Sequence, residues 1–145
     1  MTDLTLAALG WSEDFQSQLD TGESEATPPA RLCDVHRDRV QALTPDGEIT
    51  LTLPGELQAG DLAVGDWVLF DPAEQRITRA LERHSVLRRR AAGTVLMHQL
   101  IAANVDTLMI VTSCNADFNP ARLERYLTLA ASSDTTPLIV LTKAD

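Results

Sequence analysis

The chain has 145 residues, 44% of them hydrophobic, and a formal net charge of −9, so it can bury one ordinary core, or one small core and part of another. Its two cysteines, Cys33 and Cys114, lie far apart without CxxC or Cys/His spacing, which argues against a disulfide framework or a zinc site. With no signal peptide and no apolar run near the roughly 20 residues of a membrane span, we expect a cytoplasmic protein whose thiols are small buried hydrophobes.

Residues 1–30 are predicted to form an acidic, flexible leader. They hold six acidic residues and no Lys or Arg. Ser12 is expected to cap one short helix in which Phe15 and Leu19 share a face. The stretch 21–30, rich in Thr, Ser, Glu and Pro, is typical of a flexible link into the first folded element.

Short strands separated by turn residues run through residues 31–87. Gly47 supplies a turn in which Gly can take a positive φ at no steric cost, and residues 49–53 alternate strictly, which is typical of a half-buried strand. About five such strands predict a small, OB-fold-like antiparallel β-barrel. Trp67 and Phe70 belong to a strongly apolar strand and are predicted to lie in its core.

Residues 76–90 are basic within an acidic chain. They include one acidic residue and six arginines: Arg76, Arg79, Arg83, Arg88, Arg89 and Arg90. Because nucleic-acid phosphates bind to a local cationic surface, we predict that these arginines contact RNA. The alternative is a solvated edge of the barrel that neutralises nearby acids. Residues 88–104 are then expected to be a basic linker to the next unit.

Residues 105–145 are predicted to form a β–α–β unit, the start of an α/β domain. The apolar runs 108–111 and 138–141 are typical of parallel strands buried on both faces. Between them, Asn119 is expected to cap a helix that begins at Pro120. The buried face of this helix is predicted to consist of Leu123, Tyr126, Leu127 and Ala130, and the solvated face of Arg122, Glu124 and Arg125. Since ligands of open α/β sheets bind at the carboxyl ends of the strands, a ligand contact is expected directly after Leu141.

The residues at that position are Thr142, Lys143, Ala144 and Asp145. An apolar strand followed by Asn/Thr-Lys-x-Asp is the guanine-specificity element of GTPases. The Asp145 carboxylate would accept two hydrogen bonds from guanine, in a pattern that adenine does not supply, while the Lys143 stem lies along the base. Thr142 would tie neighbouring loops together through its hydroxyl. On the local pattern alone, a helix N-terminus after a strand is an equal alternative.

Several stretches resemble the RsgA (YjeQ) family of circularly permuted GTPases, in which guanine recognition precedes the phosphate loop. No GxxxxGK[ST] motif precedes Leu141, and an all-β module stands there instead. The matching stretches are residues 9–11, 64–68, 101–106, 117–119, 122–127 and 141–145. The resemblance implies an OB-fold, a permuted P-loop GTPase domain and a C-terminal zinc-binding domain. It also implies GTP hydrolysis that the small ribosomal subunit stimulates during its late maturation.

The resemblance also sets the expected ligands and partners. GTP or GDP and Mg²⁺ would bind the full-length protein, and Zn²⁺ its C-terminal domain. This chain lacks the phosphate loop, so it is expected to bind none of these ligands and to be inactive as a GTPase. His36, His84 and His98 share no ligand spacing, which argues against a metal site within the chain. The expected partners are the small ribosomal subunit and its rRNA, and the protein is expected to be a monomer.

Two other hypotheses remain open at this stage. The chain could belong to a stand-alone OB-type RNA-binding protein whose β–α–β unit is a structural appendage, which would show salt-dependent RNA binding without a nucleotide effect. It could also belong to a different α/β enzyme that uses Lys143 and Asp145 on another substrate. Comparing GTP, ATP and XTP binding to the full protein and to Asp145→Asn separates these hypotheses.

Overall fold

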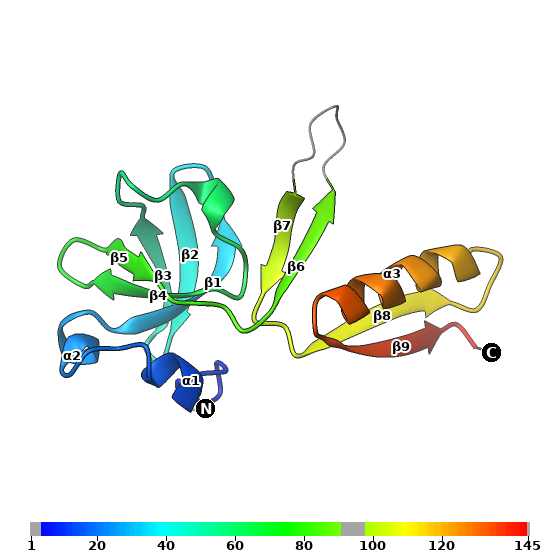
Figure 1. Cartoon of the computed structure of the whole chain (residues 1–145), viewed down its shortest axis with the longest axis horizontal. Coiled ribbons are helices and arrows are strands. Elements are labelled where there is room, and N and C mark those ends of the chain that lie inside the picture. Colours follow the sequence, from blue (N-terminus) through cyan, green and yellow to red (C-terminus); the bar gives the residue numbers. More distant parts are fainter. Residues whose placement is uncertain (1–3, 91–97, 145) are drawn as a thin grey trace.

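The computed structural model describes residues 4–90 and 98–144 (Figure 1). Along the chain, a β-barrel with two short helices at its base is followed by an antiparallel hairpin and then by a β–α–β unit. The hairpin lies between the other two parts, and the β–α–β unit extends away from the barrel. The chain therefore consists of three parts, the barrel, the hairpin and the β–α–β unit, which follow one another in sequence and in space.

The barrel is closed and consists of five strands. These are β1 (Pro29–Val35), β2 (Arg39–Thr44), β3 (Gly47–Thr52), β4 (Trp67–Asp71) and β5 (Arg76–Ala80). They pair in the order β1-β2-β3-β5-β4, and β1 closes the barrel against β4. The predicted five-stranded barrel is confirmed, with one difference in strand direction. β3 and β5 pair in parallel through Thr52 and Arg76, so the barrel is mixed rather than wholly antiparallel.

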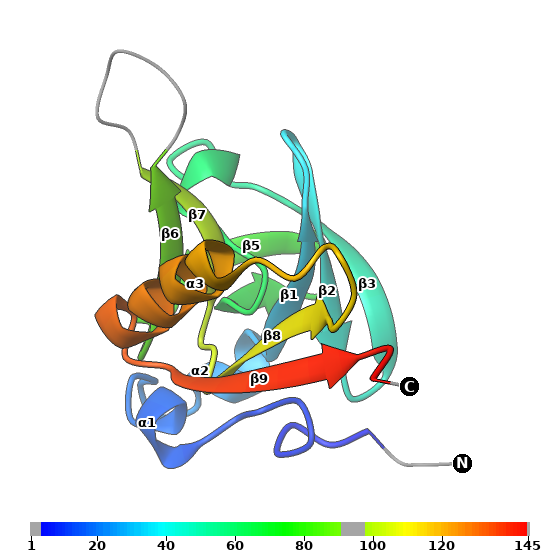
Figure 2. The same ribbon diagram turned by 90° about the vertical axis from the view of Figure 1, so that its right-hand side faces the viewer.

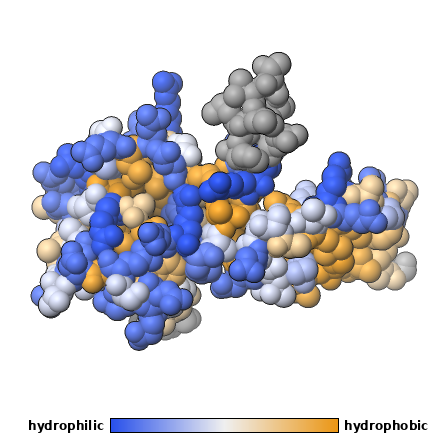
Figure 3. Space-filling view, in the orientation of Figure 1, coloured by the Kyte–Doolittle hydropathy of each residue, from blue (hydrophilic) through white to orange (hydrophobic). Residues whose placement is uncertain are grey.

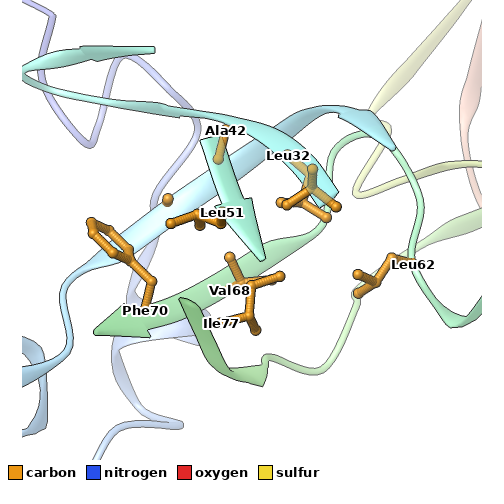
Figure 4. Packing of buried hydrophobic residues seen from close by; sticks show 9 residues of the cluster. Leu32, Ala42, Leu51, Leu62, Val68, Phe70 and Ile77 are labelled. Carbon is orange, nitrogen blue, oxygen red and sulfur yellow. The ribbon is translucent and has the colours of Figure 1, made fainter. Parts of the chain in front are cut away.

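The barrel core follows from the alternation of its strands. Leu51 is fully buried, whereas Thr50 and Thr52 on the opposite face of β3 are exposed. A short 3₁₀ helix, η1 (Ala59–Asp61), joins β3 to β4 and precedes Leu62, which covers one end of the core. Figure 4 shows how side chains from all five strands meet inside the barrel. The buried cluster consists of Ala30, Leu32, Val40, Ala42, Leu51, Leu62, Val68, Phe70 and Ile77.

The N-terminal residues pack against the barrel, which differs from the predicted flexible leader. Two short helices, α1 (Glu13–Gln16) and α2 (Glu23–Ala26), lie along its base (Figures 1 and 2). Phe15 of α1 is 1% exposed and packs in a second core cluster with Leu9, Trp67, Leu69 and Leu81. Trp67 is fully buried there, which confirms its predicted place in the core. The burial of Phe15 fixes the otherwise polar N-terminal segment against the barrel, because it removes apolar surface from water.

Residues predicted as a basic linker form a hairpin instead. β6 (Val86–Arg90) and β7 (His98–Ala103) pair antiparallel, with Val86 opposite Ala103. The arginines at the end of β6 hide the period-two pattern that would have identified a strand in the sequence. An isolated bridge between Val64 and Ala102 connects this hairpin to the loop before β4.

The β–α–β unit forms as predicted. β8 (Thr107–Ser113) and β9 (Thr136–Thr142) pair in parallel, and α3 (Pro120–Ser132) connects them. Asn119 caps α3 because its side-chain oxygen accepts a hydrogen bond from the Arg122 amide at 3.2 Å. The helix covers one face of the two-stranded sheet, as both views show (Figures 1 and 2).

The strands of this unit are more exposed than the sequence predicted. Met109 and Val111 are 58% and 59% exposed on the face of β8 that α3 does not cover. Leu138, Ile139 and Leu141 of β9 are exposed as well. Figure 3 shows the resulting apolar surface at the end of the molecule formed by this unit. The expectation of strands buried on both faces is therefore wrong for this chain. The helix α3 covers one face only, and even on that face Ile139 and Leu141 of β9 stay 43% and 52% exposed.

Candidate nucleotide-binding loop and arginine groove

The segment after β9 lies where the sequence places a ligand contact. Because β8 and β9 are parallel and in register, their carboxyl ends meet at one edge of the sheet. At this edge the Cys114 amide donates to the Thr142 carbonyl at 3.0 Å, and the Thr142 hydroxyl donates to the Thr112 carbonyl at 3.4 Å. Lys143 then leaves the strand with φ of 53°, in the left-handed region that is uncommon for a residue other than Gly.

The structure thus brings two of the three predicted guanine-binding residues to one edge. Thr142 and Lys143 are both exposed there. Asp145, which would supply the base-reading carboxylate, lies outside the described residues. The guanine contact of Asp145 therefore stays a prediction, whereas the position of its two neighbours is an observation.

The loop after β8 approaches the same edge and was not predicted from the sequence. The Asn115 side-chain oxygen accepts hydrogen bonds from the Ser113 hydroxyl at 2.6 Å and from the Asp117 amide at 3.0 Å. This Asx turn orders the chain beside Thr142. Cys114 is exposed in this loop and Cys33 is half-buried, so the expectation of two buried thiols is wrong. The Asn115-x-Asp117 spacing was the signal in the sequence that could have predicted the turn after β8.

Arg79 and Arg83 are engaged within the protein rather than free on a surface. The Arg79 guanidinium contacts both carboxylate oxygens of Glu23 at 2.8 and 2.9 Å and also donates to the Gln18 carbonyl. The Arg79 hydrogen bond, with a smaller contribution from the Asp20 amide, lowers the pKa of Glu23 to about 2. These contacts attach α2 to the outside of β5.

A second bidentate pair joins Arg83 to Asp66. Both guanidinium contacts measure 2.7 Å, and Asp66 is 1% exposed. The Asp66 carboxylate also accepts the Ala63 amide at 2.8 Å. The hydrogen bond to Asp66 raises the pKa of Arg83, which is therefore held as a cation. Arg76 contacts Glu74 in the turn before β5, so three of the six arginines predicted to contact RNA pair with acids of the same chain.

The hairpin and α3 enclose a groove that carries other arginines. Its volume is about 870 Å³, and α3 runs beside β6 and β7 there (Figure 2). Its lining consists of Arg89, Gln99, Leu100, Ile101, Arg122, Arg125, Tyr126 and Leu129. Arg88 and Arg89 are exposed on β6, and for Arg90 the structure describes the backbone as the last residue of that strand.

Two side chains of α3 that line the groove differ in exposure from the sequence prediction. Arg122, predicted to face solvent, is half-buried, and its guanidinium lies 3.5 Å from the Thr112 hydroxyl. Tyr126, predicted to be buried, is 44% exposed and lines the groove. Within residues 4–90 and 98–144, no carboxylate forms an ion pair with Arg89, Arg122 or Arg125. Sequence reasoning missed this groove because it depends on a hairpin that was not predicted.

No group of three His, Cys, Asp or Glu side chains capable of holding a metal ion occurs in the described part of the chain. Its described helices are all too short or too polar to cross a membrane.

Comparisons with known proteins connect this architecture to one family. The family model described as RsgA GTPase matches residues 80–145. A small ribosomal subunit biogenesis GTPase RsgA from Mesorhizobium japonicum is 54% identical over 141 residues, which cover 97% of this chain and 40% of the relative. A small ribosomal subunit biogenesis GTPase RsgA 2 from Vibrio vulnificus is 45% identical over 141 residues, with the same coverage of 97% and 40%.

A solved structure shares the fold. The crystal structure of YjeQ from Thermotoga maritima matches with a TM-score of 0.61 and 24% identity, over 81% of this chain and 41% of that one. This match confirms the predicted combination of an OB-type barrel with the start of a GTPase domain. The chain spans about two fifths of the length of the curated relatives it matches. On its sequence and its fold together, the chain belongs to the RsgA family.

Proposed function

We propose that the full-length protein binds and hydrolyses GTP and acts in late maturation of the small ribosomal subunit. The observation that carries this proposal is the position of Thr142 and Lys143 at the carboxyl edge of a parallel β8–β9 pair. The RsgA GTPase family model matches this part of the chain, and the relatives are named small ribosomal subunit biogenesis GTPases. We further propose that the protein acts in the cytoplasm as a monomer, where Cys33 and Cys114 stay reduced.

In this proposal, residues after β9 recognise the guanine base. Asp145 accepts two hydrogen bonds from the base, and the Lys143 stem packs along it. The contact between the Thr142 hydroxyl and the Thr112 carbonyl supports the proposed role of Thr142, which is to tie the loops after β8 and β9 together. Such a tie matters because a base-reading carboxylate must be held in one orientation to discriminate between purines.

Hydrolysis requires groups that this sequence does not contain. No GxxxxGK[ST] motif occurs in the 145 residues, and phosphoryl transfer depends on positioning the phosphates and Mg²⁺. We therefore assign Mg²⁺, and the Zn²⁺ expected from the family resemblance, to residues beyond this chain. The 145-residue chain by itself is expected to lack GTPase activity.

We propose that rRNA binds along the hairpin and the arginine groove rather than along the edge of β5. Arg89, Arg122 and Arg125 line the groove, and Arg88 is exposed next to Arg89 on β6. Arginines without carboxylate partners are available to phosphates, whereas Arg79 is held in a bidentate ion pair. Of the six arginines predicted to contact RNA, we therefore propose only those on β6, which are Arg88, Arg89 and Arg90.

The guanine proposal is tested by changing the specificity of the full-length protein. Asp145→Asn is expected to weaken GTP binding about 10²- to 10⁴-fold, because it disturbs two hydrogen bonds to a charged acceptor worth about 1.5–3 kcal/mol each. Binding of XTP should improve in the same variant, and ATP should bind weakly to both proteins. Asp134→Asn makes the same chemical change in an exposed turn before β9 and should leave all three affinities unaltered. A folded full-length protein that is indifferent to GTP and GDP would refute the proposal.

The exposed arginines favour one second candidate, a stand-alone RNA-binding protein. In that case RNA affinity would fall steeply with salt, and neither GTP nor GDP would alter it. Measuring RNA affinity of the full-length protein at several salt concentrations, with and without each nucleotide, decides between the two functions.

A further inference from the structure

Three sequence stretches that play no part in the proposed site meet at one half-buried arginine, Arg31. Arg31, at the start of the barrel, donates to the Leu9 carbonyl at 2.6 Å, to the Gly65 carbonyl at 3.3 Å and to the Asn104 carbonyl at 3.0 Å. Its guanidinium also lies 5.9 Å from the centre of the Trp67 ring. Burial lowers the pKa of Arg31, and the charge of Asp106 opposes that shift. A single side chain thus connects the N-terminal segment, the barrel and the end of the hairpin.

Gly65 brings the barrel and the hairpin into direct contact. Its φ is +97°, and a Cβ at this position would lie 2.0 Å from the Ala103 carbonyl oxygen. The Gly65 amide donates to the Leu32 carbonyl at 2.8 Å, and the Ala103 amide donates to the Val64 carbonyl at 2.8 Å. Only Gly combines this backbone conformation with so close an approach of another chain segment.

Asn104 completes the junction and leads directly toward β8. It is 3% exposed and has φ of 55°, a conformation that Asn tolerates better than most residues. Its side-chain amide donates to the Gly65 carbonyl at 2.9 Å, and its side-chain oxygen accepts the His84 amide at 3.0 Å. The Ser85 hydroxyl donates to the Val105 carbonyl at 2.8 Å, so these contacts continue almost to the first residue of β8.

We propose that Arg31, Gly65 and Asn104 are positioning residues that hold the barrel, the N-terminal segment and the start of β8 as one rigid body. The Gly65 carbonyl accepts hydrogen bonds from both other residues, so motion at the junction would break several contacts at once. A flexible linker between independent units is the opposing arrangement. The functional consequence, which rests on the proposed function, concerns how an rRNA contact affects the nucleotide site. An rRNA contact on the barrel or hairpin would be transmitted to the loop after β9 without an intervening hinge.

The rigid junction is tested by measuring distances in the 145-residue chain. One spin label is attached to the native Cys114 after β8, and a second to Glu48→Cys on β3, with Cys33→Ser to prevent a third attachment. Pulsed electron resonance then gives the distribution of distances between barrel and β–α–β unit. We expect one narrow distribution, whereas a broad distribution in the unsubstituted junction would overturn the proposal.

Two variants identify the residues responsible. Arg31→Lys keeps the positive charge but loses the planar fork that reaches three carbonyls, and Asn104→Asp loses the donor to Gly65 while keeping the acceptor for His84. Each is expected to broaden the distance distribution at least about twofold. Arg39→Lys, the same change on an exposed residue of β2, should leave the distribution narrow. Tryptophan fluorescence shows that each variant retains the barrel, and narrow distributions in both folded junction variants would refute the assignment.

A functional measurement on the full-length protein separates this inference from the proposed function. Arg31→Lys should leave basal GTP hydrolysis and GTP affinity unaltered but reduce stimulation by the small ribosomal subunit about fivefold or more, the lower range of measured coupling between sites. Unaltered stimulation despite a broadened distribution would overturn the transmission step. If the full-length protein neither binds nor hydrolyses GTP, the proposed function fails, and the distance measurement still decides whether the junction is rigid.

Discussion

Phe15 tests whether the N-terminal residues belong to the folded structure. Its side chain is 1% exposed, and its ring centre lies 5.7 Å from that of Trp11 and 6.0 Å from that of Trp67. Phe15→Ala removes a buried aromatic ring and leaves a cavity, which costs about 3–5 kcal/mol of unfolding free energy. That loss is a large part of the roughly 5–15 kcal/mol that stabilises a typical protein. We therefore expect this single change in a short helix to destabilise the barrel strongly.

The assay is guanidinium-induced unfolding followed by tryptophan fluorescence. The chain has two tryptophans, and both Trp11 and Trp67 pack with Phe15, so the signal reports on this cluster. The unfolding free energy comes from the midpoint and the slope of the transition. Phe118→Ala is the matched control because it makes the same change at a ring that is 44% exposed, in the loop before α3. Surface substitutions of this kind usually alter stability by no more than about 0.5 kcal/mol.

Comparing the two variants distinguishes a packed N-terminal segment from a loosely attached one. A loss of about 3 kcal/mol or more for Phe15→Ala alone shows that the N-terminal segment is part of the barrel fold. Equal, small effects of Phe15→Ala and Phe118→Ala would show that residues 1–30 are loosely attached, as the composition of that segment suggested. The reasoning from burial would then be wrong.

Three further predictions follow from ionisable groups. Asp66→Asn leaves the partly buried Arg83 guanidinium without its carboxylate partner. We expect urea unfolding to show a loss of about 3 kcal/mol in unfolding free energy, near the lower end of the range for broken buried ion pairs. The pKa of Glu23 is lowered to about 2, so its stabilising pair with Arg79 is complete above about pH 4.5 and is lost as the pH falls toward 2. Thermal unfolding between pH 2 and 5 should therefore show an acid-dependent loss of stability that is smaller in Glu23→Gln, and equal slopes would contradict the pair. Iodoacetamide should modify the exposed Cys114 faster than the half-buried Cys33, because burial and, to a smaller extent, the charge of Glu48 raise the pKa of Cys33. Mass spectrometry of the two peptides measures the order of modification, and faster labelling of Cys33 would contradict this prediction.

Local patterns in the sequence were sufficient to predict the barrel strands and the β–α–β unit. The alternation of residues 49–53 places Leu51 in the core, and the Asn119-Pro120 pair starts α3. Each of these features depends on neighbours within a few residues, where backbone geometry and side-chain period act directly. The position of Thr142 and Lys143 follows from the same kind of reasoning, since two parallel strands must end at one edge.

Tertiary structure alone decided which arginines are free and what holds the N-terminal segment in place. Arg79 pairs with Glu23 across 56 residues of sequence, and Arg31 reaches Asn104 across 73. A count of charges along the chain contains no information about such partners, because the strength of an ion pair or hydrogen bond depends on distance in space. For the same reason, the exposure of Met109 depends on whether another element covers its face of the sheet. The sequence thus determined the barrel strands, β8, α3 and β9, whereas the folded chain determined which side chains meet.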